Sequence, residues 1–123
     1  MNTNALADEV LSYLNTKHSR VYRNKAPQSP TFPYVVFRLD SIINSYPSED
    51  LYVNVDVFEK AGQSVRVIED LADLIDIGLN RKIITTSILN AHFEREARQF
   101  VSTQDLIDVQ MINMRYAVRT YFK

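Results

Sequence analysis

Cysteine is absent from this 123-residue chain, and glycine occurs only twice. Without cysteine the chain has no disulfide, no thiolate nucleophile and no cysteine-based zinc site. Two glycines leave little room for a phosphate-cradling loop, and the sequence contains no G-x-S-x-G, P-loop or G-x-G-x-x-G motif. The commonest local signatures of catalysis and nucleotide binding are therefore missing.

A long apolar run and an excess of basic charge are also missing. No segment approaches the roughly 18 apolar residues that cross a bilayer, and the first residues lack the pattern of a signal peptide. The 14 Lys and Arg nearly balance the 15 Asp and Glu, which is unlike the basic field of proteins that grip nucleic acid. We expect a soluble, intracellularly made protein that binds neither a membrane nor duplex DNA tightly.

Candidate catalytic or metal-binding side chains are few. His18 and His92 are the only histidines, and neither has a companion at metal-ligand spacing. An acidic group comprises Glu69, Asp70, Asp73 and Asp76. Its spacing predicts the solvated side of an amphipathic helix rather than a metal cage. A serine–histidine–aspartate triad assembles in space and leaves no local signature. We expect no enzyme activity, no cofactor and no tightly bound metal.

The length fits a single domain, residues 1–123, with one core. Apolar residues recur at three- and four-residue spacing in segments 4–17 and 64–79, which predicts two helices. Thr3 or Asn4 can cap the first helix, and Ser64 the second. The predicted buried stripe of the second helix comprises Val65, Ile68, Leu71, Leu74, Ile75 and Leu79.

Strand patterns occupy much of the remaining sequence. A short strand is expected at 20–23, and prolines between 27 and 33 hold the next segment extended. Segment 34–40 is almost continuously apolar, which suits a strand covered on both faces, or covered on one face and paired in an oligomer on the other. Segment 51–59 alternates strictly. We expect 34–40 and 51–59 to form a hairpin with a long connection, 41–50.

That connection contains apolar residues in polar surroundings: Ile42, Ile43, Tyr46 and Pro47. Long loops in compact domains are often functional, and exposed apolar groups mark contact sites. We therefore predict that these residues contact a partner. The alternative is that they fold back onto the core of their own subunit.

Two C-terminal segments are ambiguous. Segment 83–101 can form a helix or a strand, and local propensity favours the helix. The apolar alternation in 106–122 changes phase midway, which indicates a bulge or a strand buried on both faces.

An aromatic group consists of Tyr34, Phe37, Tyr52 and Phe58. It could stack nucleic-acid bases, but too few basic residues lie between its members. Core or subunit contacts are the preferred interpretation.

The ordered set of local sequences resembles the tail-terminator, or tail-completion, proteins of long-tailed phages and prophages. The matching pieces are Val21-Tyr22, Ala26-Pro27, Phe32-Pro33-Tyr34-Val35-Val36, the alternating Tyr52–Phe58, the helix Val67–Leu79 with its Leu71-Ala72-Asp73 centre, and Tyr116-Ala117-Val118. The resemblance covers nearly the whole chain through short structural motifs.

The resemblance implies a structural subunit without enzyme activity. Such a subunit forms a six-membered ring that caps the tail tube, contacts the tube protein and a head-completion or connector protein, and lets DNA pass as cargo. It also implies assembly in the bacterial cytoplasm and a final place in the virion, at the head–tail junction.

For the fold, the resemblance implies that 88–101 is a strand paired with 106–122 across the polar break 102–105. The predicted architecture is α+β, with a mainly antiparallel sheet of about five strands and two helices packed on one face. Three alternatives remain open: another head-completion or minor tail protein, a small ligand- or nucleic-acid-binding regulator, and an enzyme.

Overall fold

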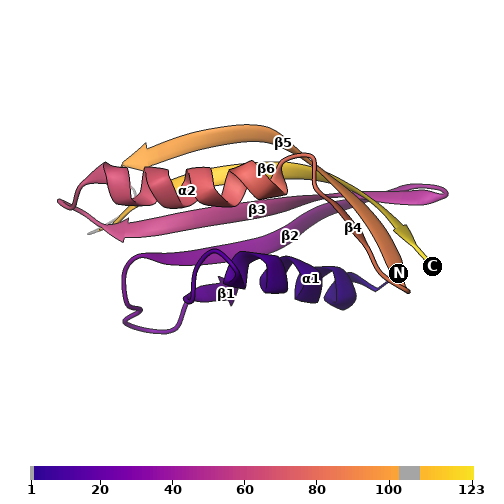
Figure 1. Cartoon of the computed structure of the whole chain (residues 1–123), viewed down its shortest axis with the longest axis horizontal. Helices are drawn as coiled ribbons and strands as arrows, with labels where there is room; N and C mark the ends of the chain where they lie inside the picture. Colours follow the sequence, from indigo (N-terminus) through magenta and orange to yellow (C-terminus); the bar gives the residue numbers. More distant parts are fainter. Residues whose placement is uncertain (1, 103–108) are drawn as a thin grey trace.

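The structure is a computed structural model that describes residues 2–102 and 109–123. Along the chain its elements are α1 Thr3–Asn15, β1 Val21–Arg23, β2 Tyr34–Ser45, β3 Ser48–Lys60, α2 Val65–Leu79, β4 Ile83–Thr85, β5 Leu89–Ser102 and β6 Val109–Phe122 (Figure 1). The fold is α+β, as predicted.

In the described ranges the sheet has six strands, in the order β1-β2-β3-β6-β5-β4. β1 runs parallel to β2, and every other pair of neighbours is antiparallel. The sheet is mixed but mainly antiparallel, as predicted, whereas the predicted number of about five strands needs correction. The prediction missed β4, which at three residues is too short to show an alternating pattern. The proline-containing segment 24–33 returns the chain so that β1 and β2 run in the same direction.

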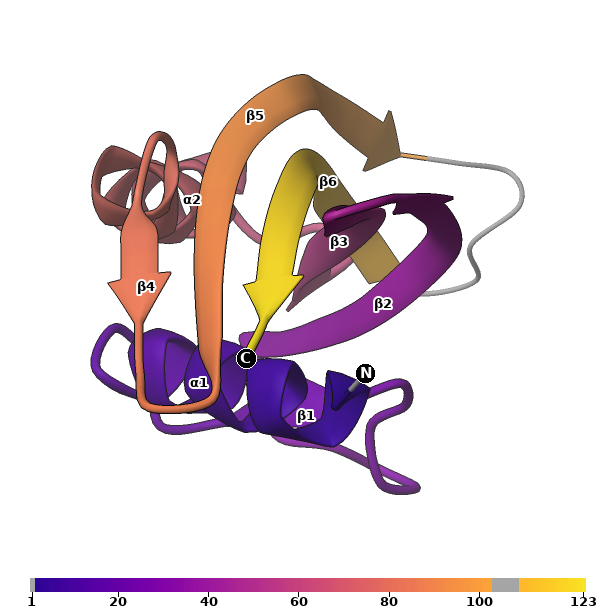
Figure 2. The same ribbon diagram turned by 90° about the vertical axis from the view of Figure 1, so that its right-hand side faces the viewer.

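Both helices pack against the same face of the sheet, called here the covered face. The strand side chains buried on it include Val35, Phe37, Val53, Val55, Val57, Ile112, Met114, Tyr116 and Val118. Figure 2 shows the strong curl of the sheet, from β2 near α1 to β5 and β4 beside α2. We call the opposite face the bare face, because neither helix lies on it.

The helices begin close to their predicted starts. The side chain of Asn2, not Thr3 or Asn4, accepts a hydrogen bond from the Ala5 amide and caps α1. Ser64 caps α2 as predicted. The buried stripe of α2 is narrower than predicted, because Leu74 keeps 46% of its surface exposed.

Residues 89–102 form a strand, so the local helix preference was wrong and the expectation from the resemblance was right. β5 pairs with β6 from Leu89↔Phe122 to Ser102↔Gln110, and this long pairing overrides a weak propensity. The bulge lies in β5, between Arg95 and Ala97, while β6 stays in register with β3. The predicted polar break and the start of the last strand at 106 lie largely outside the described residues.

The hairpin of β2 and β3 differs from its prediction. The strands continue to Ser45 and Ser48, so only Tyr46 and Pro47 form the turn. Segment 41–50 is therefore not a long loop. The register shift between Asp40 and Ile43 lets the two strands stay paired through a segment whose polar residues hid the strand pattern.

Tyr13 joins the two helices. Its hydroxyl donates a hydrogen bond to the Ile75 carbonyl at 2.8 Å. A Cβ added at Gly78 would collide with this hydroxyl. Gly78 therefore lies within α2 and leaves room for the Tyr13 side chain of α1. The left-handed backbone conformation after α2 is adopted by Arg81, with φ 66°.

Replacing Gly78 tests this contact. Gly78→Ala should lower the free energy of unfolding by about 1–3 kcal/mol through overpacking. In a Tyr13→Phe background, where the hydroxyl is absent, the same change should be tolerated or stabilising by up to about 1 kcal/mol, since alanine favours a helix. Urea unfolding of the four variants measures both effects. Equal effects of Gly78→Ala in the two backgrounds would contradict the contact.

Candidate assembly interface

The tip of the β2–β3 hairpin exposes the apolar residues singled out in the sequence. Tyr46 keeps 91% of its surface exposed, Ile43 56% and Ile42 45%, and Pro47 is exposed beside them. The hairpin extends at one end of the molecule (Figure 1). The alternative that these side chains fold back onto their own core is therefore wrong, whereas their contact with a partner stays a prediction.

The hairpin is held by its own pairing. Ile43, Asn44 and Ser45 pair across it with Asp50, Glu49 and Ser48. The Ser48 hydroxyl donates to the Ser45 carbonyl at 3.0 Å. At its base, Asp50 accepts a hydrogen bond from Nε of Arg119 on β6 at 3.1 Å. The tip is thus an ordered projection.

Charged and amide side chains form a connected network in the middle of the bare face. Asp56 is only 5% exposed and accepts hydrogen bonds from Arg38 at 3.1 Å and Asn113 at 2.6 Å. Asp40 accepts from Arg38 at 3.0 Å and from Asn54 at 2.7 Å. Because the buried carboxylate of Asp56 has partners from both neighbouring strands, this part of the face stays ordered without a covering helix.

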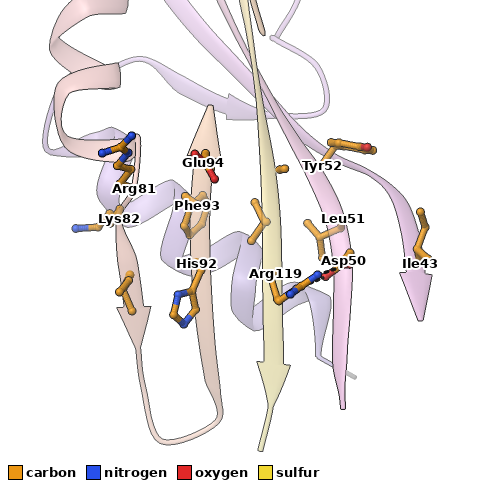
Figure 3. Close-up of a pocket in the computed structure, with 13 residues that line it drawn as sticks. Ile43, Asp50, Leu51, Tyr52, Arg81, Lys82, His92, Phe93, Glu94 and Arg119 are labelled. Atoms are coloured by element: carbon orange, nitrogen blue, oxygen red, sulfur yellow. Dashed lines mark hydrogen bonds and ion pairs between the residues drawn. The ribbon is translucent and has the colours of Figure 1, made fainter. Parts of the chain in front are cut away.

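At the hairpin end, the bare face carries a hollow of about 600 Å³ (Figure 3). One row of side chains crosses it from β2 to β4: Ile43, Asp50, Arg119, His92 and Ile83. The next row supplies Tyr52, Ala117 and Glu94, and Arg81 and Lys82 precede β4. Exposed isoleucines thus stand at both ends of a row whose middle is polar.

Aromatic side chains gather at the opposite end of the bare face. The ring of Tyr34 stacks on Phe58, with centroids 4.9 Å apart, and also contacts the ring of Phe32. Phe37 is fully buried on the covered face, and Arg115 lies 3.7 Å above the ring of Tyr52. The four aromatic residues singled out in the sequence therefore form no common stacking platform.

The acidic group on α2 is divided between internal and solvent contacts. Asp76 accepts hydrogen bonds from Arg95 and from the Tyr116 hydroxyl, each at 2.6 Å. Burial is the main cause that raises the pKa of Tyr116, followed by this bond to Asp76. Asp73 forms an ion pair with Arg98, and Glu69 and Asp70 are exposed. Asp76 thus does not belong to the predicted solvated surface.

The two histidines have separate surroundings. Nε2 of His18 lies 2.8 Å from the Pro33 carbonyl oxygen. His92 is exposed in the hollow, and its ring meets that of Tyr121 edge-on. Within residues 2–102 and 109–123, no group of three or more His, Asp or Glu side chains is placed to hold a metal ion.

A comparison with protein-family models and with curated proteins finds no match to this chain. Among the helices in the described part of the chain, none is long and apolar enough to cross a membrane.

Sequence reasoning found the hairpin tip but missed the hollow. Arg81, Lys82, His92, Glu94 and Arg119 come together only when β5 is placed between β4 and β6. The sequence signal that could have indicated the hollow is the set of polar residues at positions 90, 92 and 94 of β5, because alternate residues of a strand share a face. That signal was hidden while the segment was compatible with a helix.

If the tip side chains make no contact with the core, replacing them should leave the fold intact. Ile43→Ser with Tyr46→Ser should change the free energy of unfolding by no more than about 0.5 kcal/mol per site. Phe37→Ala, a control on the covered face, should lower it by about 3–5 kcal/mol. Thermal and urea unfolding give both values. A loss in the tip variant that approaches the control would contradict the exposed placement.

The Asp50–Arg119 pair predicts that the free energy of unfolding depends on pH. The hydrogen bond from Arg119 is the main cause that lowers the pKa of Asp50 below its ordinary value of 3.8. The pair therefore stabilises the fold above that value, and its contribution disappears as the pH falls through the lowered pKa. The contribution should be small, because the Arg119 side chain is 59% exposed and water screens the pair.

An NMR titration of the Asp50 carboxyl carbon checks the cause. Arg119→Gln should move the midpoint up towards the ordinary value, while a control change at another arginine, Arg98→Gln, should not. The same midpoint in wild type and Arg119→Gln would refute this assignment.

Proposed function

We propose that this protein is a structural subunit of a long-tailed phage or prophage, which forms a ring on the end of the tail tube and helps to join tail to head. Its partners are further copies of itself, the tube protein and a head-completion or connector protein, and DNA passes as cargo. In this role the protein needs no catalytic residue or cofactor. Its place is the head–tail junction of the virion, after assembly in the host cytoplasm.

The observation that carries the proposal is the ordered hairpin with Tyr46 at its tip. An exposed tyrosine flanked by Ile42 and Ile43 on a rigid projection contributes nothing to its own core. Aromatic and aliphatic groups of this kind are typical anchors of protein–protein contacts. A subunit that docks on neighbours and on a tube can use such a projection as its anchor.

The order of elements gives further support. The resemblance required 88–101 to be a strand against local propensity, and β5 is a strand at Leu89–Ser102. The matched pieces 34–36 and 52–58 lie in β2 and β3, whose continuation carries the hairpin tip. The resemblance and the candidate contact thus concern the same part of the molecule.

Two other roles remain in competition. A head-completion or minor tail protein would use the same kind of projection, and differs only in the structure to which it binds. The hollow beside Arg81 and Lys82 is large enough for a small ligand, which would suit a regulator. Such a regulator would bind its ligand without any tail component, whereas the proposed subunit requires tail tubes.

The direct test mixes the purified protein with tubes assembled from the major tail subunit of the same phage genome. Electron microscopy should show a cap on tube ends and an end to further elongation. Ile43→Ser with Tyr46→Ser should abolish capping, and Ile77→Ser, which changes an exposed apolar residue on α2, should not. Tubes that stay uncapped with wild-type protein, but heads that bind it, would favour the head-completion role instead.

A further inference from the structure

We propose that the hairpin tip, Tyr46 and Pro47, of one copy inserts into the hollow on the bare face of a second copy. The inference deepens the proposed function, because it supplies the contact from which a ring would be built. It depends on that function only for its biological meaning. The docking itself is a property of the isolated chain.

The tip and the hollow are matched in size and polarity. A hollow of about 600 Å³ lies within the range of pockets that hold compact ligands, and a tyrosine with an adjacent proline is a compact insert. Ile43 and Ile83 stand at opposite ends of its first row, so the hollow has an apolar side chain at either edge. His92 and Glu94 line the hollow between these edges and supply polar groups for the hydroxyl of an inserted tyrosine.

The charges of the two surfaces also match. Hairpin residues 40–50 include no lysine or arginine. Of their carboxylates, Asp40 and Asp50 are already paired with Arg38 and Arg119, which leaves Glu49. The far wall of the hollow includes the exposed Arg81, whereas the ammonium of Lys82 lies 5.0 Å from the ring centroid of Tyr13 on α1. A hairpin that enters from a second copy would bring Glu49 towards Arg81, and complementary charges of this kind fix orientation.

The hairpin tip of one copy cannot enter the hollow of the same copy. Ile43 and Asp50, which pair three residues from the turn, already line the hollow, but Tyr46 in the turn does not. Tyr46 lies beyond this pair and keeps 91% of its surface exposed. The insert and its receptor are different patches, so docking from head to tail closes a ring or extends a filament, whereas a reciprocal exchange of tips gives a two-fold dimer.

The free strand edges are poorer contact surfaces. Beyond its pairing with β4, β5 presents an edge that carries Glu94, Arg95, Glu96 and Arg98 and is interrupted by its bulge. The free half of β2 contains the register shift after Asp40. Charged side chains and bulges are the devices that keep edges from pairing with other chains. Contact through the tip and the bare face avoids both edges.

Chemical cross-linking tests the docking, and the natural absence of cysteine makes it specific. Asn44→Cys places a thiol beside the tip without removing Tyr46, and His92→Cys places one in the hollow. Both positions are exposed. The two single variants, one of them tagged, are mixed at millimolar concentration without tail tubes and treated with a short bismaleimide. A cross-linked heterodimer is expected.

Two controls keep the result interpretable. Tyr46→Ala in the Asn44→Cys chain should abolish the heterodimer, while circular dichroism confirms that the chain is folded. Ile77→Cys, on the exposed side of α2, should give no product with Asn44→Cys. No heterodimer at millimolar concentration, equal product with Ile77→Cys, or product that survives Tyr46→Ala would each overturn the proposal. Dominant Asn44–Asn44 product would also overturn it, because that product indicates a two-fold contact between hairpins.

The outcome is separable from that of the proposed function. A cross-link between isolated chains without capping of tubes would leave the docking intact and remove the tail role. Capping without the cross-link would retain the tail role and show that the copies meet through other surfaces.

Discussion

Two helices on one side of a sheet can bury only that side, and the rest of this molecule follows from that constraint. Tyr116 illustrates the arrangement, because it lies in the core on β6 and its hydroxyl reaches Asp76 on α2. With the apolar side chains gathered on the covered face, the opposite face must remain ordered in contact with water. The polar network around Asp56 meets this requirement, since its carboxylate is both buried and bonded across three strands.

The same constraint separates stability from association. The core requires nothing from Tyr46, so this residue is free to serve contact without weakening the fold. The long pairing of β2 with β3 carries the tip away from the core as a preformed element, and little conformational entropy remains to be lost on docking. Bulges and charges on the free edges disfavour association through them, which leaves the tip and the hollow as the proposed contact surfaces.

Sequence reasoning gave the fold class, both helices and the strands of the central hairpin, because these segments have regular apolar periods. It failed where the pattern of a strand depends on its neighbours. The polar residues of 41–50 looked like a loop until their pairing was visible, and 83–101 looked helical until β6 was placed beside it. The apolar tip could be named from sequence, since isoleucine and tyrosine stood out among polar residues. The hollow could not, because it unites residues of five strands through the register of the sheet.

Hydrogen exchange during assembly tests the central claim most directly, because it reports which surface of the intact chain becomes covered. Amide exchange would be followed by mass spectrometry in the free protein and after mixing with tail tubes. We predict protection of segment 43–50, together with segments 81–83 and 90–94 on the neighbouring copy, and unchanged exchange in the exposed turns of α2. Protection of α2 with an unchanged hairpin would contradict the account, since it would place assembly on the helical side of the molecule.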